Sequence, residues 1–107
     1  MSKTAEEWGR VAVSLPGWRG MPGMADNKGG RLIVGQWGPR MTPDPDDPAT
    51  AGCLLAMLGS GCRCWQDRED GLWTVEVGGV RASMHTTLGR ACIAVAEALG
   101  RWPGGAE

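Results

Sequence analysis

Two neighbouring glycines, Gly78 and Gly79, separate two runs of alternating polar and apolar residues, GLWTVEV and VRASMH. Runs joined by a two-residue glycine turn are typical of a β-hairpin with a type I′ or II′ turn. Counting outward from the turn predicts the facing pairs Val77–Val80, Glu76–Arg81, Val75–Ala82, Thr74–Ser83 and Trp73–Met84. One face of this hairpin is apolar, and the other carries a charge pair beside a hydroxyl pair. Because a one-residue slip would destroy both faces, the hairpin decides which side chains meet the core.

The segment CRCWQ, which begins at Cys62, predicts a third strand before this hairpin. A four-residue turn at Asp67–Asp70 would set Cys64 opposite Trp73 and Cys62 opposite Val75, with both thiols facing the core. The other face of the sheet would then point outward. Its predicted members are Arg63, Trp65, Leu72, Thr74, Glu76, Arg81, Ser83 and His85.

Helix signals flank the three strands. Asp47 is a good N-cap and Pro48 suits the first helical position, so a helix is predicted from Pro48 to about Leu58, with Gly59 after it. Its apolar face is Ala51, Leu54, Leu55 and Leu58. A last helix is predicted to begin at Thr86 or Thr87 and to end at Gly100, with Leu88, Ala91, Cys92, Val95 and Leu99 on its apolar face.

The opposite side of that last helix includes Ile93 and Ala94. We expect both to be exposed, which hints at self-association.

The first half of the chain is harder to interpret. Residues 1–30 are predicted to be irregular, with one helical turn within Thr4–Arg10 and a short strand at VAVSL. Trp18, Met21 and Met24 are expected to pin the glycine- and proline-rich part of this segment to the core. An additional strand is predicted from Arg31 to about Gln36.

These elements predict one domain over residues 1–107 with an α+β fold. Residues 48–100 form its helix–meander–helix unit, in the order α-β-β-β-α, with two helices packed on one face of a small antiparallel sheet that also includes the earlier strand. The net charge is −1, so no bulk attraction to nucleic acid is expected. No apolar run approaches the roughly 18 residues of a membrane span, and the first ten residues lack the apolar core of a signal peptide. We therefore expect a cytoplasmic protein without a membrane partner.

Four cysteines, Cys53, Cys62, Cys64 and Cys92, accompany a single histidine, His85. Cys62 and Cys64 are one residue apart, which is not the spacing of a zinc knuckle. Because buried cysteine behaves as a small hydrophobe, free thiols are expected, with no metal and no cofactor. The redox and metal state of the four cysteines stays open at this point. A disulfide between Cys62 and Cys92 is conceivable but disfavoured in a cytoplasm.

No catalytic pattern is present in the sequence. His85 lies near Ser83, Thr86 and Thr87, but nothing in the spacing supplies a nucleophile, a base and an orienting acid together. The acidic residues Asp44, Asp46 and Asp47 lie among prolines and are expected to form a solvated loop rather than a cation site. The sequence therefore predicts a protein that is not an enzyme.

An exposed tryptophan beside arginines favours a binding surface. The candidate contact residues are Trp18, Arg63, Trp65, Arg81 and His85. An alternative is that the N-terminal thirty residues, with Trp8 and Trp18, fold over the outward face of the sheet. Both interpretations stay open at this point.

The segments LPGWRGMPGM and DPATAGCLLAMLG, with the alanine-rich ending TLGRACIAVAEALG, resemble a group of small phage and prophage proteins with no assigned activity. Here PDPD replaces the Pro-Asp-Leu-Thr that usually precedes the DPATxGCLL motif of that group. The resemblance covers most of the chain. It implies a phage or prophage accessory protein in the host cytoplasm that binds a host or phage protein, with a homodimer as one option.

The order helix, three strands, helix is also similar to the double-stranded-RNA-binding domain, whose last helix ends in an alanine-rich stretch. Ala94, Ala96, Ala98 and Leu99 stand in that place. This similarity implies an alternative function as a nucleic-acid or nucleotide binding module that uses Arg63, Arg81 and Arg90. That domain binds phosphates through basic residues at the start of its last helix, whereas Arg90 is the only charged residue there in this chain. Nucleic acid is therefore the less favoured partner.

Overall fold

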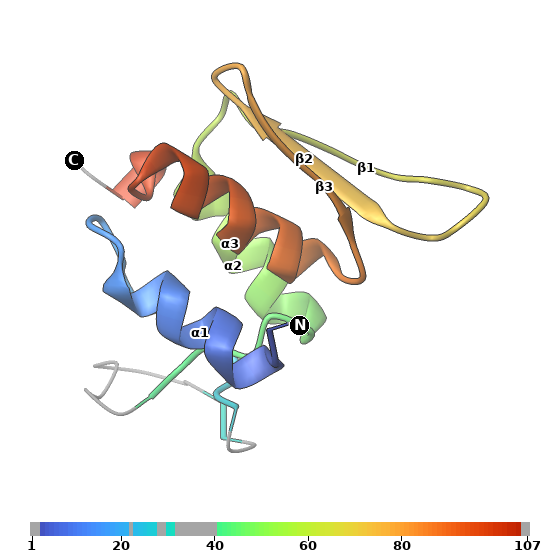
Figure 1. Cartoon of the computed structure of the whole chain (residues 1–107). Coiled ribbons are helices and arrows are strands. Elements are labelled where there is room, and N and C mark those ends of the chain that lie inside the picture. The colour runs from blue at the N-terminus through green and yellow to red at the C-terminus, as the bar shows by residue number, and fades with distance from the viewer. Residues whose placement is uncertain (1–2, 22, 28–29, 32–40, 106–107) are drawn as a thin grey trace.

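The computed structural model describes residues 3–21, 23–27, 30–31 and 41–105. Their elements are α1 (Ala5–Ser14), α2 (Pro48–Leu58), β1 (Arg63–Gln66), β2 (Trp73–Val77), β3 (Val80–His85), α3 (Leu88–Leu99) and a final 3-10 turn (Pro103–Gly105). The strands form an antiparallel meander in the order β1-β2-β3. The three helices lie on one side of this sheet, so the fold is α+β, as predicted (Figure 1).

Helix α3 is the centre of the molecule. It packs against β2 and β3 on one side, and α1 and α2 pack against its other sides. Five of its residues are completely buried: Ala91, Cys92, Ile93, Val95 and Ala96. The expectation that Ile93 is exposed is therefore wrong, because α1 adds a third helix to the α3 surface. Ala94 is half-buried, so the exposed pair from which self-association was inferred is not formed.

Helix α1 begins with a capping box. The Thr4 hydroxyl accepts the Glu7 N–H, and the Glu7 carboxylate accepts the Thr4 N–H. Its buried side carries Trp8 and Ala12, one turn apart, and the helix continues to Ser14. The strand expected at VAVSL is therefore wrong. Helical spacing places Trp8 and Ala12 on one buried side of α1. Strand alternation would instead have placed Val11 and Val13 on one face.

Helices α2 and α3 have the caps expected from the sequence. Asp47 accepts the Thr50 N–H at 3.0 Å, and Pro48 occupies the first turn. Thr87 caps α3 by accepting the Arg90 N–H, and Gly100 ends it at φ 80°. Because only glycine adopts positive φ at little cost, Gly100 is suited to this position.

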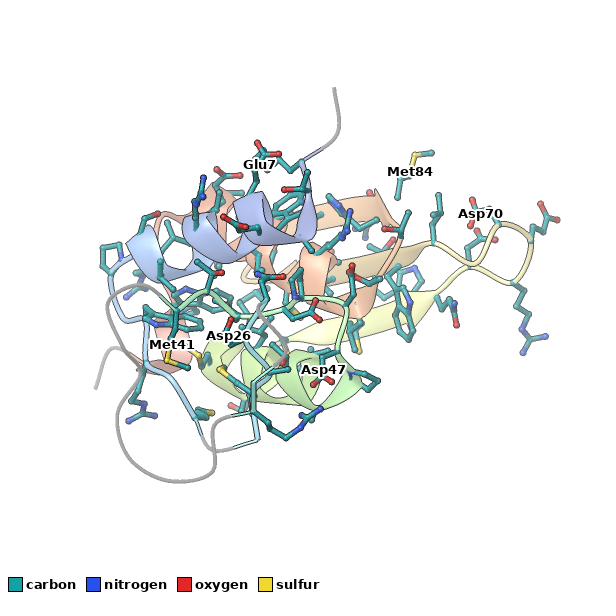
Figure 2. All side chains as sticks on the ribbon, turned by 90° about the horizontal axis from the view of Figure 1, so that it is seen from below. Glu7, Asp26, Met41, Asp47, Asp70 and Met84 are labelled. Atoms are coloured by element: carbon teal, nitrogen blue, oxygen red, sulfur yellow. The ribbon has the colours of Figure 1, made fainter. Side chains whose placement is uncertain are left out.

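The hairpin register is confirmed next to the turn and wrong at its far end. Val77–Val80, Glu76–Arg81 and Val75–Ala82 pair as predicted. Beyond them a β-bulge sets two residues of β3 against one of β2, so Trp73 pairs with His85 rather than with Met84. Met84 lies at φ 66° with 74% of its surface exposed, and Figure 2 shows it projecting from the molecule. The extra residue also turns His85 to the helix side of the sheet, although the sequence placed it outward.

Strand β1 is shifted by two residues from the predicted register. It pairs Cys64 with Val75 and Trp65 with Thr74, and Asp67–Leu72 forms a longer loop than expected. The Asp67 carboxylate holds this loop by accepting the N–H groups of Glu69 and Asp70. A two-residue shift keeps each side chain on its predicted face. Cys64 is nevertheless exposed rather than in the core, because the main helix contact with the sheet is that of α3 with β2 and β3.

The strand predicted from Arg31 to Gln36 lies outside the described residues except for Arg31, which bridges Ala25. The preceding segment is fastened to the core as expected: Met24 is completely buried, and Trp18 and Met21 pack against the core. No helix in the described part of the chain is long and apolar enough to cross a membrane.

Candidate functional site

The outer face, which we define as the side of the sheet opposite the helices, carries an exposed tryptophan. Trp65 of β1 keeps 42% of its surface accessible. The guanidinium of Arg81 lies 5.3 Å from the centre of the indole ring, a cation–π contact that crosses the sheet from β3. The Arg81 Nη2 also lies 3.0 Å from Glu76 Oε2. The aromatic surface and its neighbouring cation are therefore held in place by the sheet.

Charge on the outer face is predominantly positive. Arg63 pairs with Glu76 in the β1–β2 register, and Arg81 pairs with the same glutamate from the other strand. Arg81 forms the ion pair with Glu76. The Arg63 guanidinium makes no ion pair or hydrogen bond with the described residues. Thr74 and Ser83 add hydroxyl groups. Strand alternation thus gathers Arg63, Trp65 and Arg81 on one surface.

The structure does not bring the other two candidate residues to this face. Trp18 lies 6.0 Å from Trp102, ring centre to ring centre, and packs against the core. His85 meets the Trp8 ring edge-on at 5.5 Å. Trp8 and Trp18 are therefore occupied on the helix side of the sheet, and neither covers the outer face.

His85 is placed for packing with α1. Its removal from water, with the neighbouring charges of Arg90 and Lys3, lowers the pKa of the imidazole below its usual value. Within the described residues no hydrogen bond links His85 to a hydroxyl or carboxylate that would orient it as a catalytic base. The ring instead packs edge-on against Trp8 at the end of the sheet.

None of the four cysteines forms a disulfide, and their surroundings differ. Cys92 is buried in α3, and removal from water raises the pKa of its thiol. Cys53 and Cys62 are half-buried, and burial likewise raises their pKa values. Cys64 is exposed on β1. In the described ranges no three side chains of the metal-ligating types gather into a site.

A pocket of about 290 Å³ lies where the N-termini of α2 and α3 meet. The Asp46 carboxylate accepts the Thr87 hydroxyl at 2.8 Å and the Arg90 guanidinium at 2.9 Å. Gly89 packs so closely that a Cβ there would lie 1.9 Å from the Pro45 carbonyl oxygen. The Asp46 carboxylate is therefore paired with Thr87 and Arg90, and these contacts fasten the loop before α2 to the start of α3.

The Asp46–Arg90 pair was not predicted. It joins residues 44 positions apart, and local spacing carries no signal for such a contact. It also occupies Arg90, one of the three arginines proposed for nucleic-acid contact. Arg63 and Arg81 remain on the outer face.

Comparison of the chain with protein-family models, with curated proteins and with solved structures gave no match. The geometry of the outer face and the sequence patterns therefore carry the functional assignment.

Proposed function

We propose that this protein is a non-enzymatic binding protein that engages another protein through the outer face of its sheet. The observation that carries the proposal is Trp65, which is 42% exposed on a sheet face that the described helices leave open, with Arg81 held over its ring. Tryptophan and arginine are the residue types that most often dominate binding energy at protein interfaces.

The chemistry of the face favours a partner with a shallow apolar pocket bordered by acidic groups. The indole of Trp65 would enter the pocket, and Arg63 would meet a carboxylate because Glu76 already pairs with Arg81. Both Trp65 and Arg81 are held in place before binding, so little side-chain entropy is lost on association.

The biological setting is part of the same proposal. The DPATxGCLL motif and the alanine-rich ending resemble phage and prophage proteins, which supports an accessory protein acting in the host cytoplasm on a host or phage protein. A role for His85 or the thiols in catalysis is not proposed, because His85 packs against Trp8 and Cys92 is buried.

The test compares variants in affinity capture from an extract of infected cells, followed by binding of the purified partner. We expect Trp65→Ala and Arg81→Ala to lose the partner, with a fall in affinity of roughly 30-fold or more for Trp65→Ala. Their melting temperatures should stay close to that of the parent, since both side chains are exposed. Met84→Ala is the matched control, because Met84 is an even more exposed apolar side chain.

A partner that binds Trp65→Ala and the parent chain equally would refute the proposed surface. Nucleic acid provides the second arm of the test. If the outer face binds nucleic acid instead, a gel shift should appear at low salt and weaken steeply as salt rises. If such a gel shift is seen and Trp65→Ala and Arg81→Ala still capture the same proteins as the parent chain, the nucleic-acid alternative replaces the proposal.

A further inference from the structure

Strand β1 is an open edge of the sheet. It pairs with β2 alone among the described strands, and all four of its residues are exposed. Such an edge presents unpaired backbone groups to any strand that approaches.

The register shows which backbone groups point to the open side. Asp67 donates its N–H to the Leu72 carbonyl at 2.8 Å, and these two residues lie opposite each other in the β1–β2 register. Hydrogen-bonded and non-hydrogen-bonded pairs alternate along an antiparallel ladder. Arg63 and Trp65 therefore bond to β2, whereas Cys64 and Gln66 direct their N–H and C=O groups away from it.

We propose that β1 pairs in antiparallel fashion with β1 of a second copy of this chain, about a two-fold axis at Trp65. The two meanders then form one six-stranded sheet. This inference goes beyond the proposed function, because it concerns the backbone edge of β1 and its occupant, although Arg63 and Trp65 of the outer face also contribute to the pairing.

The sequence of β1 is complementary to itself in this register. Cys64 lies opposite Gln66 of the second copy, and the two exchange the backbone hydrogen bonds that face the open edge. Trp65 lies opposite Trp65 of the second copy at a non-hydrogen-bonded position, where Cα atoms approach to about 4.5 Å and side chains contact most closely. Aromatic pairs at such positions stabilise a sheet.

Charge supports the same occupant. In this register Arg63 lies opposite Asp67 of the second copy, an opposite-charge pair that the two-fold axis creates twice. Arg63 is exposed, and Glu76, which lies between Arg63 and Arg81 in the sheet, already pairs with Arg81. Asp67 lies in the exposed β1–β2 loop, which extends away from the helices to the tip that Asp70 marks (Figure 2).

The register also keeps the two copies in the same orientation. Odd-numbered residues of β1 face odd-numbered residues, so both outer faces lie on one side of the joined sheet and the helices lie on the other. β1 is the strand farthest from α1 and α3 in Figure 1, which leaves its edge open to approach. Because four-residue strands bury little surface, the dimer should be weak and dependent on concentration.

The first experiment measures amide hydrogen exchange and sedimentation of the full chain up to about 1 mM protein. Exchange at Cys64 and Gln66 should slow as the dimer forms, whereas Arg63 and Trp65 should change little because β2 already protects them. A monomer throughout this range would overturn the proposal, as would a dimer without added protection at Cys64 and Gln66.

Two pairs of variants test the edge and its charges. Cys64→Pro removes an N–H that points to the open side, so it should abolish the dimer, while Cys64→Ala should retain it. Arg63→Glu should weaken the dimer at least tenfold by facing Asp67, while Arg19→Glu makes the same charge change at another exposed arginine and should not. Dimers that persist in Cys64→Pro would overturn edge pairing.

A cross-link tests the register. In a Cys62→Ser, Cys64→Ser background, Trp65→Cys should form an intermolecular disulfide under mild oxidation, because the two Cα atoms fall within disulfide range. Thr74→Cys, on the central strand β2, should not. Equal cross-linking of the two variants would overturn pairing about Trp65.

Failure of this inference is distinguishable from failure of the proposed function. Arg81→Ala should lose the protein partner and keep the dimer, since Arg81 lies on β3. Cys64→Pro should do the reverse.

Discussion

At the scale of single residues, Asp47 both caps the start of α2 and forms an ion pair with Arg31. Its carboxylate accepts the Thr50 N–H as an N-cap and lies 2.8 Å from the Arg31 guanidinium. The hydrogen bond from Arg31 is the largest cause that lowers the pKa of Asp47 to about 2 from its usual 3.8. Figure 2 shows Asp47 at this end of the helix.

The lowered pKa predicts how stability depends on pH. An acid with a depressed pKa in the folded state adds stability above its unfolded value, and this stability is lost as pH falls toward the folded value. For Asp47 the loss should occur between about pH 4 and pH 2 and amount to roughly 1 kcal/mol, since Arg31 is half exposed and solvent screens the pair. Urea unfolding at a series of pH values measures it.

Asp47→Asn is the matched control for this prediction. Its amide oxygen keeps the cap but does not titrate, so the difference in unfolding free energy between Asp47→Asn and the parent should shrink as pH falls through this window. A constant difference from pH 5 to pH 2 would contradict the assignment.

At the scale of elements, the bulge in β3 explains both the exposure of Met84 and the position of His85. Met84 has a φ of 66°, a conformation that costs an L-residue free energy and suits glycine. Met84→Gly should therefore raise the free energy of unfolding by about 0.5 to 1 kcal/mol, because little side-chain burial is lost. Thermal unfolding of the variant checks this.

Ser83→Gly, one residue earlier in β3, provides the comparison. Ser83 has a negative φ, so glycine there should destabilise the strand by about 0.5 to 1 kcal/mol. If both glycine variants destabilise equally, the bulge does not hold Met84 in the left-handed conformation.

At the scale of the whole molecule, the depth of each cysteine in the packed sheet and helices should determine how fast its thiol reacts. Cys64 lies exposed on the open strand, Cys53 and Cys62 are half-buried, and Cys92 lies inside α3 between the sheet and the other helices. A thiol reagent applied to dilute native protein should modify Cys64 first and Cys92 only as fast as the protein unfolds. Mass spectrometry of the labelled peptides gives the order.

Denaturant supplies the control for this order. All four thiols should react at similar rates in the unfolded chain. Native-state labelling of Cys92 at the rate of Cys64 would mean that α1 and α2 do not enclose α3.

Part of the candidate site was predictable from the sequence. The alternation of side chains about Gly78-Gly79 placed Glu76 and Arg81 on the outer face. Alternation along β1 placed Arg63 and Trp65 on the same face, even though the predicted register of β1 was shifted by two residues. His85 was wrongly placed on this face, and Trp18, a separate contact candidate from the N-terminal segment, does not lie on it. Trp18 packs near Trp102, and the bulge reverses the direction of His85.

Local chemistry by itself determined the caps of α2 and α3, the turn between β2 and β3, and the apolar face of each strand next to that turn. These depend on residues a few positions apart, whose hydrogen bonds and alternation are written in the chain. Only the tertiary structure decided that Ile93 is buried, that Cys64 is exposed, that Asp46 pairs with Arg90 and that β1 pairs with β2 alone among the described strands. Each of these depends on which distant element occupies the neighbouring space, and local spacing does not encode that.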